Sequence, residues 1–185
     1  MPLKEHGFSL VEVLLAMAIS SIMLLGAARF LPGLQRATLM QAGLQELEDE
    51  LWLRAMAVGK QLQRAGYCAG QCQGAALSIN ERCVIVQWDA NSNGRWERSP
   101  LSAAEQTGFR LTDGALETLR GATGCEGKGW DKLTDPGRIL IQRFQVNKTE
   151  LTGFAPQLEV LLSGSLTGRP ESAMTVSQRV TGFNL

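Results

Sequence analysis

The chain has 185 residues, of which 44% are hydrophobic, so it can bury one modest core in addition to a membrane segment. Its 18 basic and 18 acidic residues give a formal net charge of zero, and neither sign forms a long run. This balance argues against a nucleic-acid-binding surface, so we expect no nucleic acid among the partners.

The N-terminal part combines a short leader with an apolar segment of membrane length. We expect residues 1–7 to have no structure of their own and residues 8–29 to form a transmembrane helix. From Phe8 to Ala28 the only charged residue is Glu12, and about 21 residues at ~1.5 Å per residue can cross a bilayer core. An ordinary secretory signal peptide is the alternative. A carboxylate weakens the insertion core of such a peptide and contributes nothing to its cleavage.

The sequence Gly7-Phe8-Ser9-Leu10-Val11-Glu12 resembles the class III signal of type IV prepilins and type II secretion pseudopilins. The resemblance implies that a prepilin peptidase cuts between Gly7 and Phe8, that Phe8 is then N-methylated, and that Glu12 is used in assembly. There its carboxylate can pair with the free amine of a neighbouring subunit in a low-dielectric helix bundle. The resemblance also implies a single-pass protein of the inner membrane with a periplasmic C-terminal head. Lys4, which precedes the apolar segment, agrees weakly with that orientation.

Residues 30–65 are predicted to continue the helix in amphipathic form. Pro32 and Gly33 should kink or loosen it, because proline removes a backbone donor and clashes with the preceding turn. Beyond them apolar residues recur at spacings of three and four, and Gly66 is a plausible C-terminal glycine. The apolar stripe consists of Leu44, Leu47, Leu51, Ala55, Val58, Leu62 and Ala65. A membrane anchor followed by an unrelated coiled segment is the alternative.

Residues 66–185 change to a β pattern and are expected to form a globular head. A hairpin is predicted around Asp113-Gly114, one of the strongest short hairpin signals, between residues 108–112 and 115–119. Further strands are predicted at residues 83–88, 139–146, 158–162 and 175–183. The expected fold is α+β and type IV pilin-like: a long N-terminal helix, half membrane-spanning and half amphipathic, packed on an antiparallel β-sheet head.

Four cysteines, Cys68, Cys72, Cys83 and Cys125, follow the membrane segment, and their even number suits an oxidising compartment. Three pairings are possible. We favour Cys68 with Cys72 and Cys83 with Cys125, because the second bond would tie the first strand to the loop after the hairpin. A zinc site is the alternative, but a four-thiolate site would be unusual in an oxidising periplasm.

Oxygen-bearing side chains alternate in the segment that follows the first predicted strand. Asp89, Asn91 and Asn93 precede a glycine, as in the first half of a calcium loop, and Glu97 offers a further carboxylate. The match is incomplete, because Pro100 stands where an EF-hand has its bidentate glutamate. A hairpin in which Asn93-Gly94 joins the strand to residues 95–98 is the structural alternative. No cofactor is certain, and calcium is a possible one.

Catalysis is not expected. The single histidine, His6, lies in the leader, so no histidine base remains in the processed chain to activate a serine or a cysteine. Carboxylates alone do not indicate an active site. We therefore predict a structural protein and no enzyme.

The sequence of the head resembles one group of pilins more closely than the others. Residues 62–68, 83–94, 119–123 and 180–185 are similar to PilW-type minor pilins of type IV pili, and the resemblance runs over essentially the whole chain. It implies a low-abundance subunit that primes pilus assembly near the tip. The implied partners are other minor pilins, the major pilin, the prepilin peptidase and the inner-membrane assembly platform. A minor pseudopilin of a type II secretion system and a pilin-targeted periplasmic calcium-binding or adhesive module are the alternatives.

Overall fold

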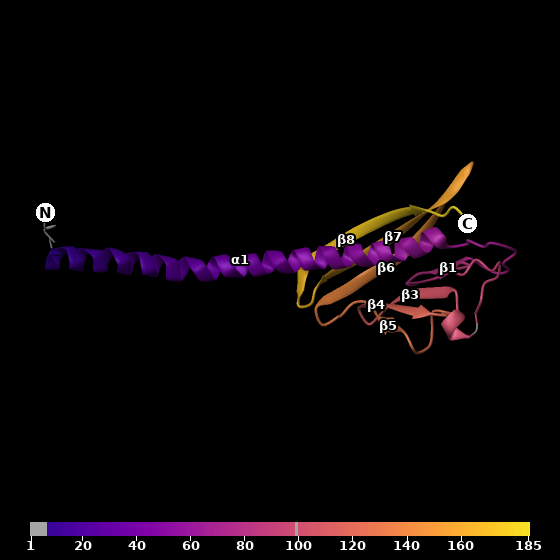
Figure 1. Ribbon diagram of the computed structural model, residues 1–185, viewed down its shortest axis with the longest axis horizontal. Coiled ribbons are helices and arrows are strands. Elements are labelled where there is room, and N and C mark those ends of the chain that lie inside the picture. Colours follow the sequence, from indigo (N-terminus) through magenta and orange to yellow (C-terminus); the bar gives the residue numbers. More distant parts are fainter. Residues whose placement is uncertain (1–6, 99) are drawn as a thin grey trace, which may run out of the picture. The chain divides into compact units, whose positions relative to one another are not determined.

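The structure is a computed structural model that describes residues 7–98 and 100–185. The predicted leader, apart from Gly7, lies outside the described residues. The chain divides into two compact units, one that ends at Gly43 and one that comprises Leu44–Leu185. Helix α1 (Leu10–Arg64) contributes to both units and is the helix labelled α1, coloured from indigo to magenta, in Figure 1.

In the first unit, α1 exposes its apolar side chains. All residues from 7 to 42 are exposed, and an 18-residue window of α1 has a mean hydropathy of 2.2 with none of it buried. Within the described residues α1 is the one helix that is long and apolar enough to cross a membrane. The helix continues through Pro32, so the predicted loosening there does not interrupt it. A single proline removes one backbone hydrogen bond, and the turns on either side keep theirs.

In the second unit, α1 buries one face in the core of the head. The buried residues recur at helical spacing and are Leu47, Leu51, Ala55, Val58, Gly59 and Leu62. The helix ends where the sequence predicted. Gly66 has a positive φ of 84°, which favours glycine, and its N–H donates to the carbonyl oxygen of Gln87 at 3.0 Å.

A five-stranded antiparallel sheet forms the first part of the head. Its strands lie in chain order and are β1 (Leu77–Asn80), β2 (Cys83–Gln87), β3 (Gln106–Thr112), β4 (Ala115–Arg120) and β5 (Asp131–Lys132). A short 3₁₀ helix, η1 (Leu101–Ala103), precedes β3. The β3–β4 hairpin is the predicted one: Asp113 and Gly114 both have positive φ, 49° and 75°, as a type I′ turn requires.

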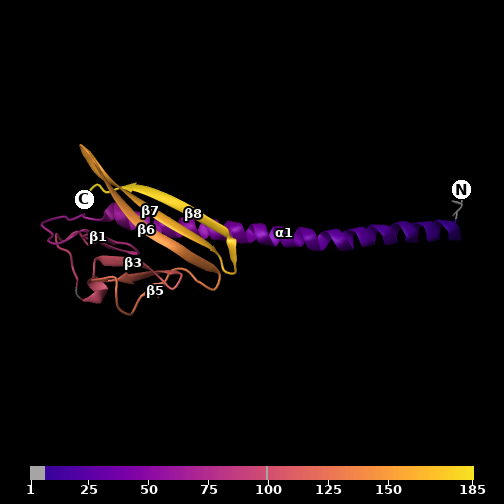
Figure 2. The same ribbon diagram turned by 180° about the vertical axis from the view of Figure 1, so that it is seen from behind.

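A three-stranded antiparallel sheet forms the second part. Its strands are β6 (Ile139–Leu151), β7 (Phe154–Leu166) and β8 (Arg169–Thr181). The pairing of β8 with β7 ends at Gln157, so the β6–β7 hairpin continues beyond that residue as a two-stranded ribbon. The ribbon ends in the turn Thr152-Gly153, where Phe154 is 80% exposed. Figures 1 and 2 show this end projecting from the rest of the sheet.

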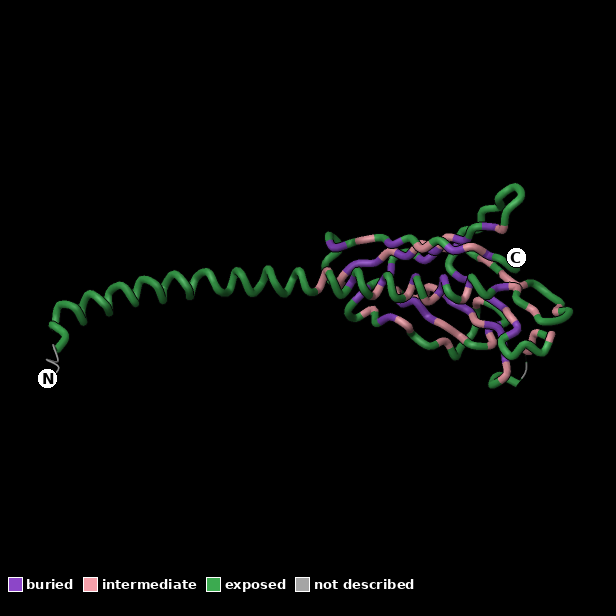
Figure 3. Tube along the Cα trace, turned by 45° about the horizontal axis from the view of Figure 1, so that its top comes forward, coloured by how far each residue is buried: buried purple, intermediate pink, exposed green. Residues whose placement is uncertain are grey.

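The two sheets and the C-terminal part of α1 share one hydrophobic core. Leu51 of α1, Val84 and Val86 of β2, and Phe144 of β6 are buried members of it. A Cβ on Gly164 of β7 would lie 3.4 Å from a methyl group of Leu51, so the helix lies close to the three-stranded sheet. Buried residues in Figure 3 are accordingly confined to the head and to the part of α1 beside it.

Three predictions about the head were incomplete or wrong. The expected single sheet is divided into two, and the short strands β1 and β5 were missed. Strands β6, β7 and β8 are longer than predicted. Strands β6 and β7 end in a ribbon whose exposed positions lack the alternating pattern, and β8 begins with three exposed residues. The hairpin predicted through Asn93-Gly94 is absent: β2 ends at Gln87, and residues 95–98 form no strand. The N–H of Glu97 donates to the carboxylate of Glu105 and that of Arg95 to the side-chain oxygen of Asn93, instead of to a partner strand.

Candidate functional sites at the helix start and in the loops

The start of α1 is closed by a reciprocal pair of side chains. The N–H of Ser9 donates to Oε2 of Glu12 at 2.8 Å, and the N–H of Glu12 donates to Oγ of Ser9 at 3.4 Å. With Leu10 as the first helical residue, this is a capping box, in which two otherwise unpaired backbone donors are satisfied. Glu12 was predicted to act in assembly, and this second role was not predicted. The spacing Ser-x-x-Glu before an apolar run was the signal for it.

Gly7 and Phe8, the residues predicted to flank the cleaved bond, lie before the helix. Phe8 is 86% exposed, and a Cβ placed on Gly7 would meet nothing within 4 Å. The bond between them is therefore in non-helical, accessible backbone. Cleavage at this bond and methylation of Phe8 stay predictions.

The four cysteines form two disulfides, which join Cys68 to Cys72 and Cys83 to Cys125. These are the pairs favoured from the sequence. The second bond ties the start of β2 to the loop after the β3–β4 hairpin. Asp89 lies close enough to Cys68 and Cys72 to suggest a metal cluster. Both sulfurs are engaged in the disulfide, however, so they are not available as thiolate ligands.

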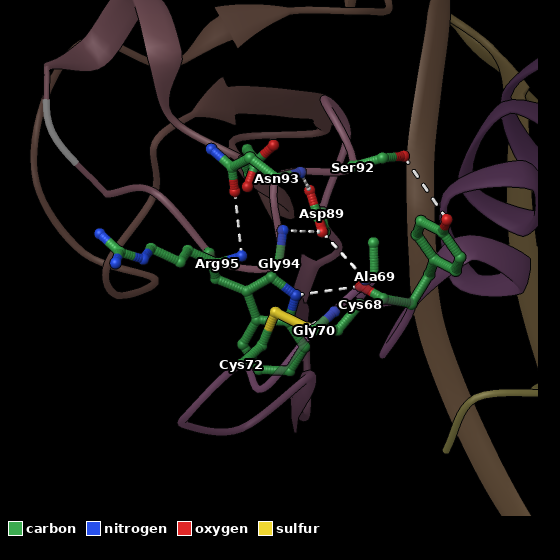
Figure 4. Close-up of a disulfide and its surroundings, with 12 residues drawn as sticks. Cys68, Ala69, Gly70, Cys72, Asp89, Ser92, Asn93, Gly94 and Arg95 are labelled. Carbon is green, nitrogen blue, oxygen red and sulfur yellow. Dashed lines mark hydrogen bonds between the residues drawn. A yellow bond between two sulfur atoms is a disulfide. The ribbon is translucent and has the colours of Figure 1, made fainter.

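The short disulfide loop packs against the segment after β2, as Figure 4 shows. Both oxygens of Asp89 point into the junction. Oδ2 accepts from the N–H groups of Ala69 at 3.0 Å and Gly94 at 2.8 Å, and Oδ1 accepts from that of Asn93 at 3.0 Å. Gly70 and Gly94 touch through their backbones, because a Cβ on Gly70 would lie 2.8 Å from the Cα of Gly94. Asp89 is thus the bridge between two loops.

The environment of Asp89 has opposing effects on its ionisation. Burial of the carboxyl group raises its pKa, since only 1% of the residue is exposed. The backbone N–H groups of Ala69, Gly94 and Asn93 stabilise the ionised form, and their sum prevails, so the pKa of Asp89 lies below its ordinary value. The carboxylate is therefore ionised at neutral pH.

Glu105 also holds this loop, and the sequence did not predict it. Its side chain is buried, with 4% exposed. Oε1 accepts from the N–H groups of Ala90 at 2.7 Å and Asn91 at 3.1 Å, and Oε2 accepts from that of Glu97 at 3.2 Å. Its sequence position carried no signal, because it lies after the loop and before β3. Glu105 and Asp89 together supply the acceptors that a strand would otherwise provide.

The predicted calcium ligands use their oxygens within the loop. Oδ1 of Asn91 accepts from the N–H of Asn93, and Oδ1 of Asn93 accepts from the N–H of Arg95, both at 3.0 Å. The side-chain amides of these two asparagines donate to the carboxylate of Glu97, and the bond from Asn93 is the first cause of a lowered pKa of Glu97. The side-chain oxygens of Asp89, Asn91, Asn93 and Glu97 thus each accept a hydrogen bond from within the loop or next to it. Calcium binding stays an untested prediction.

A further polar cluster covers the face of the five-stranded sheet that points away from the core. The Arg110 guanidinium bonds to Oε2 of Glu117 and to the carbonyl oxygen of Cys125, each at 2.9 Å, and lies over the ring of Trp130 at 4.3 Å from its centroid. These contacts hold the glycine-rich loop at residues 121–129 against the sheet.

Comparison with known proteins finds a matching family and a similar chain. A family model described as prepilin peptidase-dependent protein B matches residues 40–182, and the model of the prokaryotic N-terminal methylation motif matches residues 2–28. The chain is similar to prepilin peptidase-dependent protein B of Escherichia coli (strain K12), with 57% identity over 187 aligned residues that cover 100% of both chains. No solved structure gives a significant match.

Proposed function

This chain belongs to the prepilin peptidase-dependent protein B family, and from that premise we propose that it is a minor pilin that takes part in priming type IV pilus assembly, near the pilus tip. The observation that carries the proposal is the methylation motif at the head of an apolar helix. Such a helix can be held in a membrane first and among other helices later, because both surroundings are apolar.

The head contributes shape and contacts in this proposal. The described cysteines are all paired, and no histidine follows residue 6, so the usual nucleophile–base pairs are missing from the described part of the head. We therefore assign it no catalysis. Two disulfides suit a head that folds in the periplasm, on the far side of the inner membrane from the leader. Its partners are other minor pilins, the major pilin and the assembly platform.

The capping box refines the role of Glu12. In the uncut chain, Glu12 serves the N–H of Ser9. Cleavage after Gly7 creates a positively charged amine on Phe8, next to the same N–H group. The carboxylate can then move from the backbone of its own helix to the amine of a neighbouring subunit, where it offsets a charge in an apolar bundle.

Mass analysis of the mature N-terminus tests the targeting. Protein purified from membranes of a strain that has the prepilin peptidase should begin at methylated Phe8, and protein from a strain without it should keep its leader. A terminus near Arg29, or an intact Met1 in both strains, would contradict the proposal. The number of pili that the protein restores, counted after shearing, then separates a role in the pilus from a role in secretion.

Substitutions of Glu12 separate charge pairing from helix capping. Glu12→Gln keeps a side-chain acceptor for the N–H of Ser9 and removes the charge, whereas Glu12→Ala removes both. If pairing with an amine drives assembly, both variants lose pili to a similar extent, by at least tenfold. If Glu12→Gln assembles like the parent protein, the capping role is sufficient and the pairing role is wrong.

A further inference from the structure

The outer face of the five-stranded sheet holds a cavity of about 260 Å³. It lies over β1, β2 and β3, beside the loop that the Cys83–Cys125 disulfide ties down. Side chains alternate along β2: Val84 and Val86 point into the core, so Ile85 and Gln87 point to the cavity. Gln87 is nevertheless only 2% exposed, because loops cover this face.

Gln87 is the first reason to regard the cavity as a binding site. Its amide nitrogen Nε2 is buried and has no hydrogen-bond partner within the described residues. Buried polar groups in folded proteins are almost always paired, and a ligand in the cavity that Gln87 lines would supply the missing acceptor once the amide turns toward it. Leucine or methionine would fill the same position without that cost.

Arg98 is the second reason, because it is held in place over the cavity. The side-chain amide of Gln106 forms two hydrogen bonds when its oxygen faces Arg98. The amide oxygen then accepts from Nε of Arg98 at 3.2 Å, and the amide nitrogen donates to the carbonyl oxygen of Ala122 at 3.0 Å. Gln106 is itself 5% exposed. A Cβ on Gly74 would lie 2.9 Å from Nη2 of Arg98, so a residue without a side chain leaves room for the guanidinium.

The charge and the donors of the cavity indicate the ligand. Among the described residues that line the cavity, Arg98 is the one that carries a charge, and none is acidic. The hydroxyl groups of Ser78 and Thr123 also line the cavity. A guanidinium, an unpaired amide N–H and hydroxyl donors together match a planar group with two acceptor oxygens. We propose that this cavity binds a carboxylate group, either of a free small acid or of an acidic side chain on another protein chain.

NMR titration of the full-length chain in detergent micelles tests the site. Sodium acetate is the probe for a free carboxylate, a capped Gly-Glu-Gly peptide is the probe for an acidic side chain, and sodium chloride at matched ionic strength is the control. Either carboxylate should shift the side-chain signals of Gln87 and Arg98 saturably. Binding of acetate with weaker binding of the peptide identifies a small acid as the ligand, and the reverse identifies a protein side chain.

Two arginines of the same loop give matched variants. Arg98→Gln should weaken carboxylate binding at least tenfold. Arg95→Gln removes an exposed charge outside the cavity lining, so carboxylate binding should stay unchanged. Gln87→Leu, which removes the buried donor, should also weaken binding while its circular dichroism stays native. Shifts no larger than with chloride, equal binding of inorganic phosphate, or equal losses in both arginine variants would overturn the proposal. None of these results bears on pilus assembly, so the site and the proposed function fail independently.

Discussion

The carboxylate of Asp89 joins two loops through main-chain donors alone, and its protonation should weaken the head. Because its folded-state pKa lies below the ordinary value of 3.8, ionised Asp89 stabilises the folded state fully above that range. The contribution is lost as the pH falls through the folded-state pKa. Glu97 and Glu159, whose pKa values are lowered first by bonds from Asn93 and Ser177, act in the same direction. The melting temperature should therefore drop on acidification below about pH 4.

Asp89→Asn tests this assignment. The substitution turns one acceptor oxygen into an NH₂ group that faces backbone donors, so we expect a loss of several degrees in melting temperature at neutral pH and a shallower acid dependence. Asp113→Asn is the matched control, since asparagine suits the positive φ of that turn. Equal pH profiles for Asp89→Asn and the parent chain would contradict the assignment. A saturable rise in melting temperature with calcium, lost in Asp89→Asn, would support the calcium prediction.

At the scale of elements, the two disulfides should differ in their effect on stability. The Cys83–Cys125 bond spans a sequence separation of 42 and the Cys68–Cys72 bond one of 4. Loop-closure entropy predicts that loss of the first costs about 4 kcal/mol and loss of the second about 2 kcal/mol. Denaturant unfolding of the two paired Cys→Ser variants, followed by tryptophan fluorescence, measures the difference. Equal midpoints would show that strand contacts alone hold the loop at residues 121–129.

The buried stripe of α1 should matter far more than its exposed neighbours. Leu51 is completely buried, and Leu51→Ala should lower the free energy of unfolding by about 3 kcal/mol through the lost contacts and the cavity left behind. Leu53, two residues along and 56% exposed, is the control, and Leu53→Ala should change it by less than about 0.5 kcal/mol. Similar losses at both positions would mean that the helix does not pack on the sheets as described.

At the scale of the whole molecule, the fold class was predictable because its signals are local. The apolar stripe of α1, the glycine after it and the Asp113-Gly114 turn each depend on a few adjacent residues. The division into two sheets and the structure of the loop at residues 89–97 were not predictable in this way. That loop depends on Glu105 and on the N–H of Ala69, and no local pattern shows that such distant groups will meet.

The candidate sites were likewise predictable only where their signals are local in the sequence. The methylation motif and the cysteine pairs could be proposed from adjacent residues and strand order. The capping role of Glu12 had a local signal that went unused. The cavity over β1–β3 had none, because Gln87, Arg98 and Thr123 come from three separate segments.

Two of the hairpin turns of the head differ in whether they could accept an inserted peptide. At Thr152-Gly153 the backbone is free: a Cβ on Gly153 would meet nothing within 4 Å, and the ribbon beneath has no third strand. At Asp113-Gly114 the turn is packed, since a Cβ on Gly114 would lie 2.3 Å from a methyl group of Leu140, and the Gly114 carbonyl accepts from the N–H of Ile141. An epitope spliced in after Thr152 should leave the melting temperature within about 2 °C of the parent and bind its antibody, whereas one after Asp113 should unfold the head. The ribbon tip is thus the natural place for a handle by which the protein can be followed in living cells.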